Sequence, residues 1–84
     1  MPYIKKELRI QAERIGPRSA GDLTYLLYKH CMDYLCFLKA GQENRFADYA
    51  LVLGALEACK LELARRHLTP HEDQRMLENG DIFP

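Results

Sequence analysis

The chain has 84 residues and no net charge, because twelve basic side chains balance twelve acidic ones. Apolar residues make up 48% and charged residues 29%, a composition that excludes a disordered chain. The balanced charge argues against nucleic-acid binding, and the absence of a long apolar run argues against a membrane partner. We expect one helical domain over residues 1–84, in the cytoplasm because no hydrophobic signal segment opens the sequence.

The charges and the cysteines are unevenly placed. Residues 1–20 hold five bases and two acids, whereas residues 61–84 hold three bases and five acids. The three cysteines are an odd number without a secretion signal, which argues against a disulfide framework. Cys31 and Cys59 fall in apolar helical patterns, so we expect them to be small buried side chains.

The first predicted helix spans about residues 2–15. Pro2 suits a first helical position, where its missing N–H has no partner to lose. The helix carries one apolar stripe at spacings of four, four and three. The stripe consists of Ile4, Leu8, Ala12 and Ile15. Gly16 and Pro17 then end the helix.

The second predicted helix spans about residues 22–40, with Ser19 or Asp22 as its N-cap. Eight residues fall on one apolar face at helical spacing, which is a strong helical pattern. They are Leu23, Leu26, Leu27, His30, Cys31, Tyr34, Phe37 and Leu38.

The third predicted helix is the longest, from Glu43 or Asn44 to Leu68. One face consists of Tyr49, Val52, Leu56, Cys59 and Leu63, and a second of Phe46, Ala50, Leu53, Leu61, Ala64 and Leu68. A surface helix normally has an apolar arc of a little over ~100°. The wider arc here must be covered on more than one side. The short link to the preceding helix predicts an antiparallel hairpin.

The fourth predicted helix spans about residues 70–79. Thr69, Pro70 and Glu72 match a capping box with threonine at N-cap, proline at N1 and glutamate at N3. We expect Pro70 to separate this helix from the third one, and the final Ile82 and Phe83 to dock on the bundle. The predicted fold is therefore all-α, a small helical bundle built on a long antiparallel hairpin with two shorter flanking helices.

No catalytic or metal-binding pattern emerges. His67 and His71 have a spacing that suits metal chelation, but Pro70 places them on different predicted elements. His30 is expected to be a hydrogen-bonded core or interface histidine, because no nucleophile or acid is placed beside it. No Ser/His/Asp set, phosphate loop or dinucleotide glycine pattern appears. We expect no catalytic residue, no metal and no cofactor, and therefore not an enzyme.

A basic cluster next to the fourth helix has two interpretations. Arg65 and Arg66 either pair with Glu62 on a solvated face, or bind an anion together with His67 and His71. In the second case, the N–H groups at the start of the fourth helix would contribute.

An excess of tyrosine and apolar surface favours protein association. Tyr25 and Tyr28 fall away from the main core face, and aromatic residues placed so are enriched at interfaces. The wide apolar arc of the third helix adds to this surface, so we expect a homo-oligomer. The candidate interface residues are Tyr25, Tyr28, Met32, Tyr49, Leu51, Val52, Ala55 and Leu56.

Several segments resemble a family of short, uncharacterised phage and prophage proteins. They are the opening MPYIKKELR, the segment GDLTYLLYKHCMDYL and the block LGALEACKLELARRHLTPHEDQRMLENGD. The family pattern has a tyrosine where His71 stands here. The resemblance implies a viral or prophage origin and supplies no activity.

Two functional hypotheses follow. The first is a non-catalytic phage accessory protein that binds a host protein stoichiometrically. The second is an oligomer that binds or sequesters a nucleotide or another anion through Arg65 and Arg66.

Overall fold

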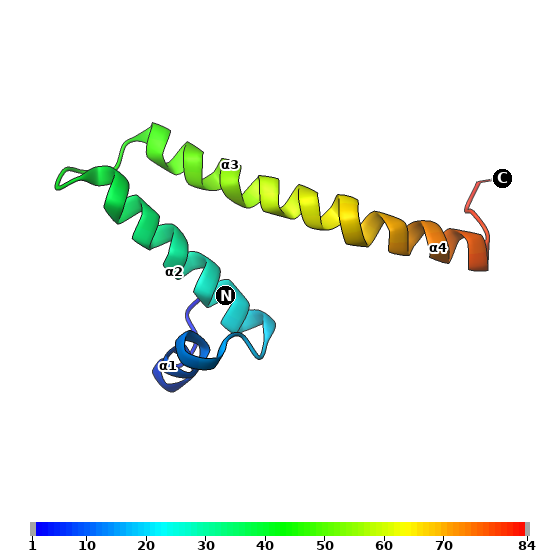
Figure 1. Cartoon of the computed structure of the whole chain (residues 1–84), viewed down its shortest axis with the longest axis horizontal. Helices are drawn as coiled ribbons and strands as arrows, with labels where there is room; N and C mark the ends of the chain where they lie inside the picture. The colour runs from blue at the N-terminus through cyan, green and yellow to red at the C-terminus, as the bar shows by residue number, and fades with distance from the viewer. Residues whose placement is uncertain (1, 84) are drawn as a thin grey trace. The chain divides into compact units, whose positions relative to one another are not determined.

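The computed structural model describes residues 2–83 and confirms the all-α class, with no strand in that range (Figure 1). The helical elements, in chain order, are α1 (Lys6–Ile15), α2 (Ala20–Lys39), α3 (Phe46–Leu63), the π-helical turn η1 (Ala64–Leu68) and α4 (Thr69–Asn79). The chain divides into two compact units, residues 1–52 and 53–84, so α3 contributes its first two turns to one unit and its remainder to the other.

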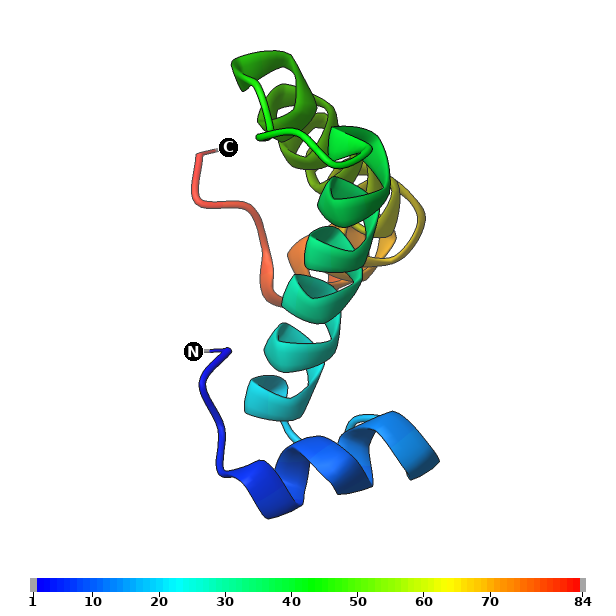
Figure 2. The ribbon, with the colours of Figure 1, turned by 90° about the vertical axis from the view of Figure 1, so that its left-hand side faces the viewer.

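In the first unit, α1 packs against the N-terminal end of α2 (Figure 2). The prediction that α1 begins at Pro2 is wrong, because residues 2–5 are not helical. Instead, the Ile4 side chain packs on α2 next to Gly21. If Gly21 carried a Cβ, that atom would lie 3.3 Å from Ile4 Cγ2. The Arg9 guanidinium Nε donates to the Ile4 carbonyl (2.8 Å) and holds this extended segment in place. Gly16, with φ of +93°, ends α1 as predicted.

Both candidate N-cap residues of α2 take part in its start. Ser19 is the N-cap, and its Oγ accepts the N–H of Asp22 (3.0 Å). The Asp22 carboxylate reaches back and accepts the N–H of Arg18 (3.0 Å). This reciprocal arrangement resembles a capping box and satisfies otherwise unpaired donors. It also explains how Asp22 is buried with only 7% of its surface exposed.

The link between α2 and α3 is fixed by Asn44. Its Nδ2 donates to the Leu35 carbonyl (2.8 Å) and to Asp48 Oδ2 (3.2 Å). The Asp48 carboxylate also accepts the N–H of Arg45 (3.1 Å), as the third residue of a capping box does. One amide thus ties the last turns of α2 to the first turn of α3.

The predicted break between a third and a fourth helix is wrong. The backbone stays helical through Pro70, and Thr69 is itself helical, with φ −60° and ψ −49° and no side-chain cap at the start of α4. The Thr69 N–H donates to the Ala64 carbonyl five residues earlier, which is the π-helical pattern. A widened turn before a proline leaves room for its ring against the preceding carbonyls. The π-turn therefore absorbs Pro70 where a capping box was expected.

The apolar core is small and lies in the first unit. Its buried members are Ala12, Leu35 and Val52, whereas no large apolar side chain between Leu53 and Phe83 is buried. Ile82 and Phe83 are 86% and 81% exposed, so their predicted docking on the bundle is wrong.

The cysteines are also less buried than expected. Cys31 is half-buried, whereas Cys36 and Cys59 are exposed, and all three are free thiols. His30 is exposed too, so a role in the core is excluded for it and only the interface role remains open.

Candidate functional site

A polar seam between α1 and α2 is the most connected group of side chains in the first unit. The Tyr25 hydroxyl donates to Glu13 Oε2 (3.1 Å), and the Arg9 guanidinium lies 5.7 Å from the centre of the Tyr25 ring. Lys29 approaches both Glu13 (3.5 Å) and Asp33 (3.4 Å). The seam therefore fixes α1 on α2 with alternating charges around one half-buried aromatic ring.

The seam also perturbs the acidity of its members. Partial burial, followed by the hydrogen bond to Glu13, raises the pKa of Tyr25. The hydrogen bond to Asp33, and then the charges of Asp33 and Glu13, raise the pKa of Lys29. Both groups are held in their protonated forms, which suits a structural contact. A tyrosine or lysine that acts as a general base would instead need a pKa lowered towards neutral pH.

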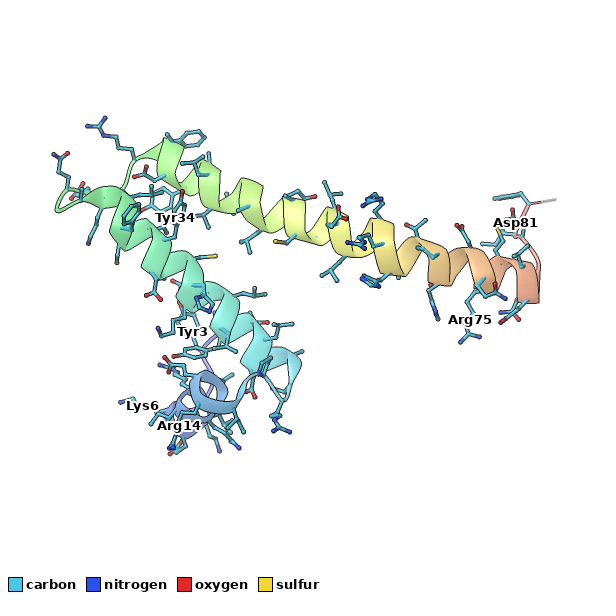
Figure 3. All side chains as sticks on the ribbon, in the orientation of Figure 1. Tyr3, Lys6, Arg14, Tyr34, Arg75 and Asp81 are labelled. Carbon is cyan, nitrogen blue, oxygen red and sulfur yellow. The ribbon has the colours of Figure 1, made fainter. Side chains whose placement is uncertain are left out.

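The predicted tyrosine interface on α2 is only partly available. Tyr25 belongs to the seam, so its ring is committed within the chain. Tyr28 remains 45% exposed and packs against Tyr3, with the two ring centres 6.2 Å apart. Tyr3 is labelled beside α2 in Figure 3. The contact with Tyr3 raises the pKa of Tyr28. Met32, one turn further along α2, is 40% exposed.

The predicted interface residues on α3 divide between the core and the surface. Val52 is 8% exposed and belongs to the core of the first unit, so its placement at an interface is wrong. Tyr49 and Leu51 remain about half exposed, at 48% and 55%, and Leu56 is 38% exposed. Ala55 is exposed as well. The surface of α3 is apolar on several sides, as the sequence predicted.

The candidate anion site is not assembled by the second unit. Arg65 and Arg66 both pair with the Glu62 carboxylate, Arg66 through its Nε at 3.9 Å. A carboxylate between the two guanidiniums offsets one of their two positive charges and occupies donors that an anion would need. His67 lies on η1 and shares an open surface groove with Cys59, Glu62, Leu63 and Arg66.

The second part of the predicted anion site, a free helix N-terminus beside the arginines, is also absent. His71 lies on α4, and the helical backbone continues through Thr69, so no free helix N-terminus lies next to the arginines. The interpretation in which the arginines pair with Glu62 on a solvated face agrees with these contacts. Arg75, labelled in Figure 3, similarly pairs with Glu78 (3.9 Å) towards the C-terminal end of α4.

Sequence reasoning missed the residues that organise the first unit. Asn44 and Asp48 fix the turn into α3, beside a small open depression lined by Leu38, Lys39, Ala40, Gln42, Glu43, Arg45 and Asp48. An aspartate three residues after Arg45, just before an apolar run, was the available signal for this cap. The contact between Tyr25 and Glu13 joins residues twelve apart and left no local signal.

No chemistry-bearing cluster stands out in the part of the chain that the structure describes. Within residues 2–83, no group of three or more histidine, cysteine or acidic side chains is arranged to hold a metal ion. None of the helices in this range is long and apolar enough to cross a membrane.

A family described as a domain of unknown function (DUF6899) matches residues 1–82. The chain belongs to this family. The matched region contains the opening MPYI, the segment GDLTY and the C-terminal ENGD that the sequence singled out. The comparison with curated proteins found no match, and neither did the comparison with solved structures. The family's description gives no activity, so any function is argued from the surfaces of the chain.

Proposed function

We propose that this protein is a non-catalytic binding module that self-associates and acts by stoichiometric attachment to a host protein in the host cytoplasm. The resemblance to phage and prophage proteins supports an accessory role of viral origin. The chain's own surfaces support the binding role, and one of them carries most of the argument.

That surface is the helix in the second unit. Residues 53–79 are helical throughout, yet no large apolar side chain among them is buried. Isolated helices are marginally stable in water, and a helix that is apolar all round is normally covered on all sides. This helix therefore gains stability from another surface.

The size of that gain follows from three leucines. Leu53, Leu61 and Leu63 are 65%, 58% and 63% exposed. Complete burial of such a side chain contributes about 1.5–3 kcal/mol, so covering the exposed parts of these three stabilises a complex by about 3–6 kcal/mol. This is a useful fraction of the free energy of a micromolar complex, which is about 8 kcal/mol.

The alternative of an anion-binding oligomer is less well supported. The two arginines that would carry it already share Glu62, and the expected helix N-terminus is replaced by η1. Thermal-shift screening with nucleotides tests this alternative directly. A stabilisation that disappears in Arg66→Ala would favour it over protein binding.

Solution mass and co-purification test the proposed function together. Leu61→Glu places a charge on the apolar helix, and Gln74→Glu introduces the same residue on α4 at a polar position. We expect the wild type and Gln74→Glu to associate and to retain a host protein at fixed stoichiometry, and Leu61→Glu to lose both properties. A wild-type protein that stays monomeric, binds no hydrophobic dye and retains no partner would overturn the proposal.

A further inference from the structure

A second apolar stripe lies on α2, on the side away from α1. Its members recur at spacings of four, three, four and three, the pattern of a helix that pairs with another helix. They are Leu23, Leu27, His30, Tyr34 and Phe37. All five are exposed, with Leu23 at 48%, Leu27 at 46% and Phe37 at 76%. We call these five residues the α2 stripe.

The first unit leaves the α2 stripe uncovered. At 3.6 residues per turn, Tyr25 falls on the side of α2 opposite the stripe and Lys29 lies about 120° from the stripe, and these residues make the contacts to α1. Tyr34 and Phe37 stack on each other with ring centres 6.4 Å apart and nearly parallel planes. Tyr34 lies in the C-terminal half of α2 (Figure 3). The stripe is therefore preformed as an aliphatic half followed by an aromatic half.

The spacing of the α2 stripe is symmetric about its histidine. Leu23 lies seven residues before His30 and Phe37 lies seven residues after it. When two such helices run antiparallel about a two-fold axis at His30, each Leu23 meets the other copy's Phe37, and each Leu27 lies next to Tyr34. A two-fold interface requires this kind of self-complementary surface.

The charges beside the stripe have the same symmetry. Lys29 and Asp33 lie on one flank of it, 3.4 Å apart within the chain. The midpoint between them is residue 31, one residue from the axis at His30, so an antiparallel pair brings Lys29 of one copy towards Asp33 of the other. Asp33 retains 63% exposure of its side chain and can accept a second partner. A parallel pair would instead place like residues side by side.

The area of the stripe suits a weak but specific dimer. With about 200 Å² for a large side chain, the exposed parts of its four apolar members amount to roughly 430 Å² per copy. Two copies therefore bury roughly 860 Å² through these side chains, and flanking residues raise the total towards the ~1,200 Å² at which specific interfaces begin. The half-buried flanking residues are Leu26, Cys31 and Leu38.

We propose that α2 pairs antiparallel with α2 of a second copy of this chain, about a two-fold axis at His30. This goes beyond the proposed function, because it adds a second contact between copies, on α2, to the one proposed for the helix of residues 53–79. It also gives His30 a role. A polar residue at the centre of an apolar seam fixes register at a cost in stability.

Crosslinking tests the orientation. In a background with the three cysteines changed to serine, one chain carries Leu23→Cys and another carries Phe37→Cys. We expect a short thiol crosslinker to join the two chains when mixed and to leave each alone uncrosslinked, because like positions of the two copies lie on opposite sides of the axis, about 21 Å from each other. Crosslinking of each chain with itself, or no crosslinking of the mixture, overturns the proposal.

Point variants test the surface by sedimentation, with circular dichroism as the check on folding. His30→Leu removes the polar group at the axis and tightens the dimer by roughly tenfold or more. His30→Glu places two carboxylates face to face and dissociates it. Asp33→Lys places like charges together across the axis and weakens the dimer. Met32→Glu, on the opposite side of α2, is the matched control and leaves the dimer intact.

The outcomes separate this proposal from the previous one. Loss of association in His30→Glu but not in Leu61→Glu supports the α2 pairing and contradicts a role of residues 53–79 in self-association. The reverse result overturns the α2 pairing alone. If His30→Leu and Asp33→Lys leave the mass unchanged and alter only the melting temperature, the stripe is covered within one chain and the proposal is wrong.

Discussion

Two substitutions of a hydroxyl residue by alanine should have opposite effects on stability. Ser19→Ala removes the N-cap of α2, so that the N–H of Asp22 loses its acceptor at 3.0 Å. Loss of such a cap costs about 1–2 kcal/mol. Thr69→Ala changes a residue with helical backbone angles and no capping hydrogen bond. Alanine is the better helix former there, so we expect a gain of a few tenths of a kcal/mol.

The positions of the tyrosines make the assay specific. All five tyrosines lie within residues 1–52, and the chain has no tryptophan. Near-ultraviolet signals therefore follow the first unit, whereas the far-ultraviolet helix signal follows both. Ser19→Ala should lower the tyrosine-detected melting temperature by roughly 4–8 °C for each kcal/mol lost.

Two results would contradict this description of Ser19 and Thr69. If Thr69→Ala costs as much as Ser19→Ala, Thr69 caps a separate fourth helix and the continuous helical backbone through η1 is wrong. If Ser19→Ala has no effect, the reciprocal cap with Asp22 does not contribute to the start of α2.

Three further predictions follow from the contacts of the first unit. Asn44→Ala removes two hydrogen bonds and should lower the urea-unfolding free energy by about 1–2 kcal/mol, whereas the exposed Gln42→Ala should change it little. Leu35→Ala empties part of a thin core and should cost about 2–4 kcal/mol in the same experiment; a cost below that of a surface change would exclude Leu35 from the core. The raised pKa values of Tyr25 and Lys29 mean that the folded state holds these protons more tightly than the unfolded state. Their contribution is complete below pH ~10 and is lost as the pH rises through the folded values, so the melting temperature should fall at alkaline pH and fall less steeply in Tyr25→Phe.

Local signals predicted most of the helical structure. The spacing of apolar residues located α1, α2 and α3, and Gly16 and Gly80 mark helix ends at which the backbone adopts a positive φ. Ser19 and Asp22 were both recognised as capping residues, although their reciprocal roles depend on three-dimensional geometry.

The predictions that were wrong concern positions at which several local rules compete. Thr69, Pro70 and Glu72 satisfy a capping pattern, but a π-turn allows the helix to continue through the proline, and nothing in the pattern distinguishes the two outcomes. Val52 and Leu56 lie on the same predicted face, yet only Val52 is buried. Which residue of an apolar face is covered depends on packing between elements, and periodicity alone does not carry that information.

Hydrogen exchange of residues 53–63, measured at several protein concentrations, tests most directly whether this apolar helix is covered by another molecule. We predict that its amides exchange rapidly in dilute protein and become protected as the concentration rises, because an uncovered helix of this kind is marginally stable. Strong protection that does not change with concentration would show that the chain covers this helix by itself, and would contradict the association-based account.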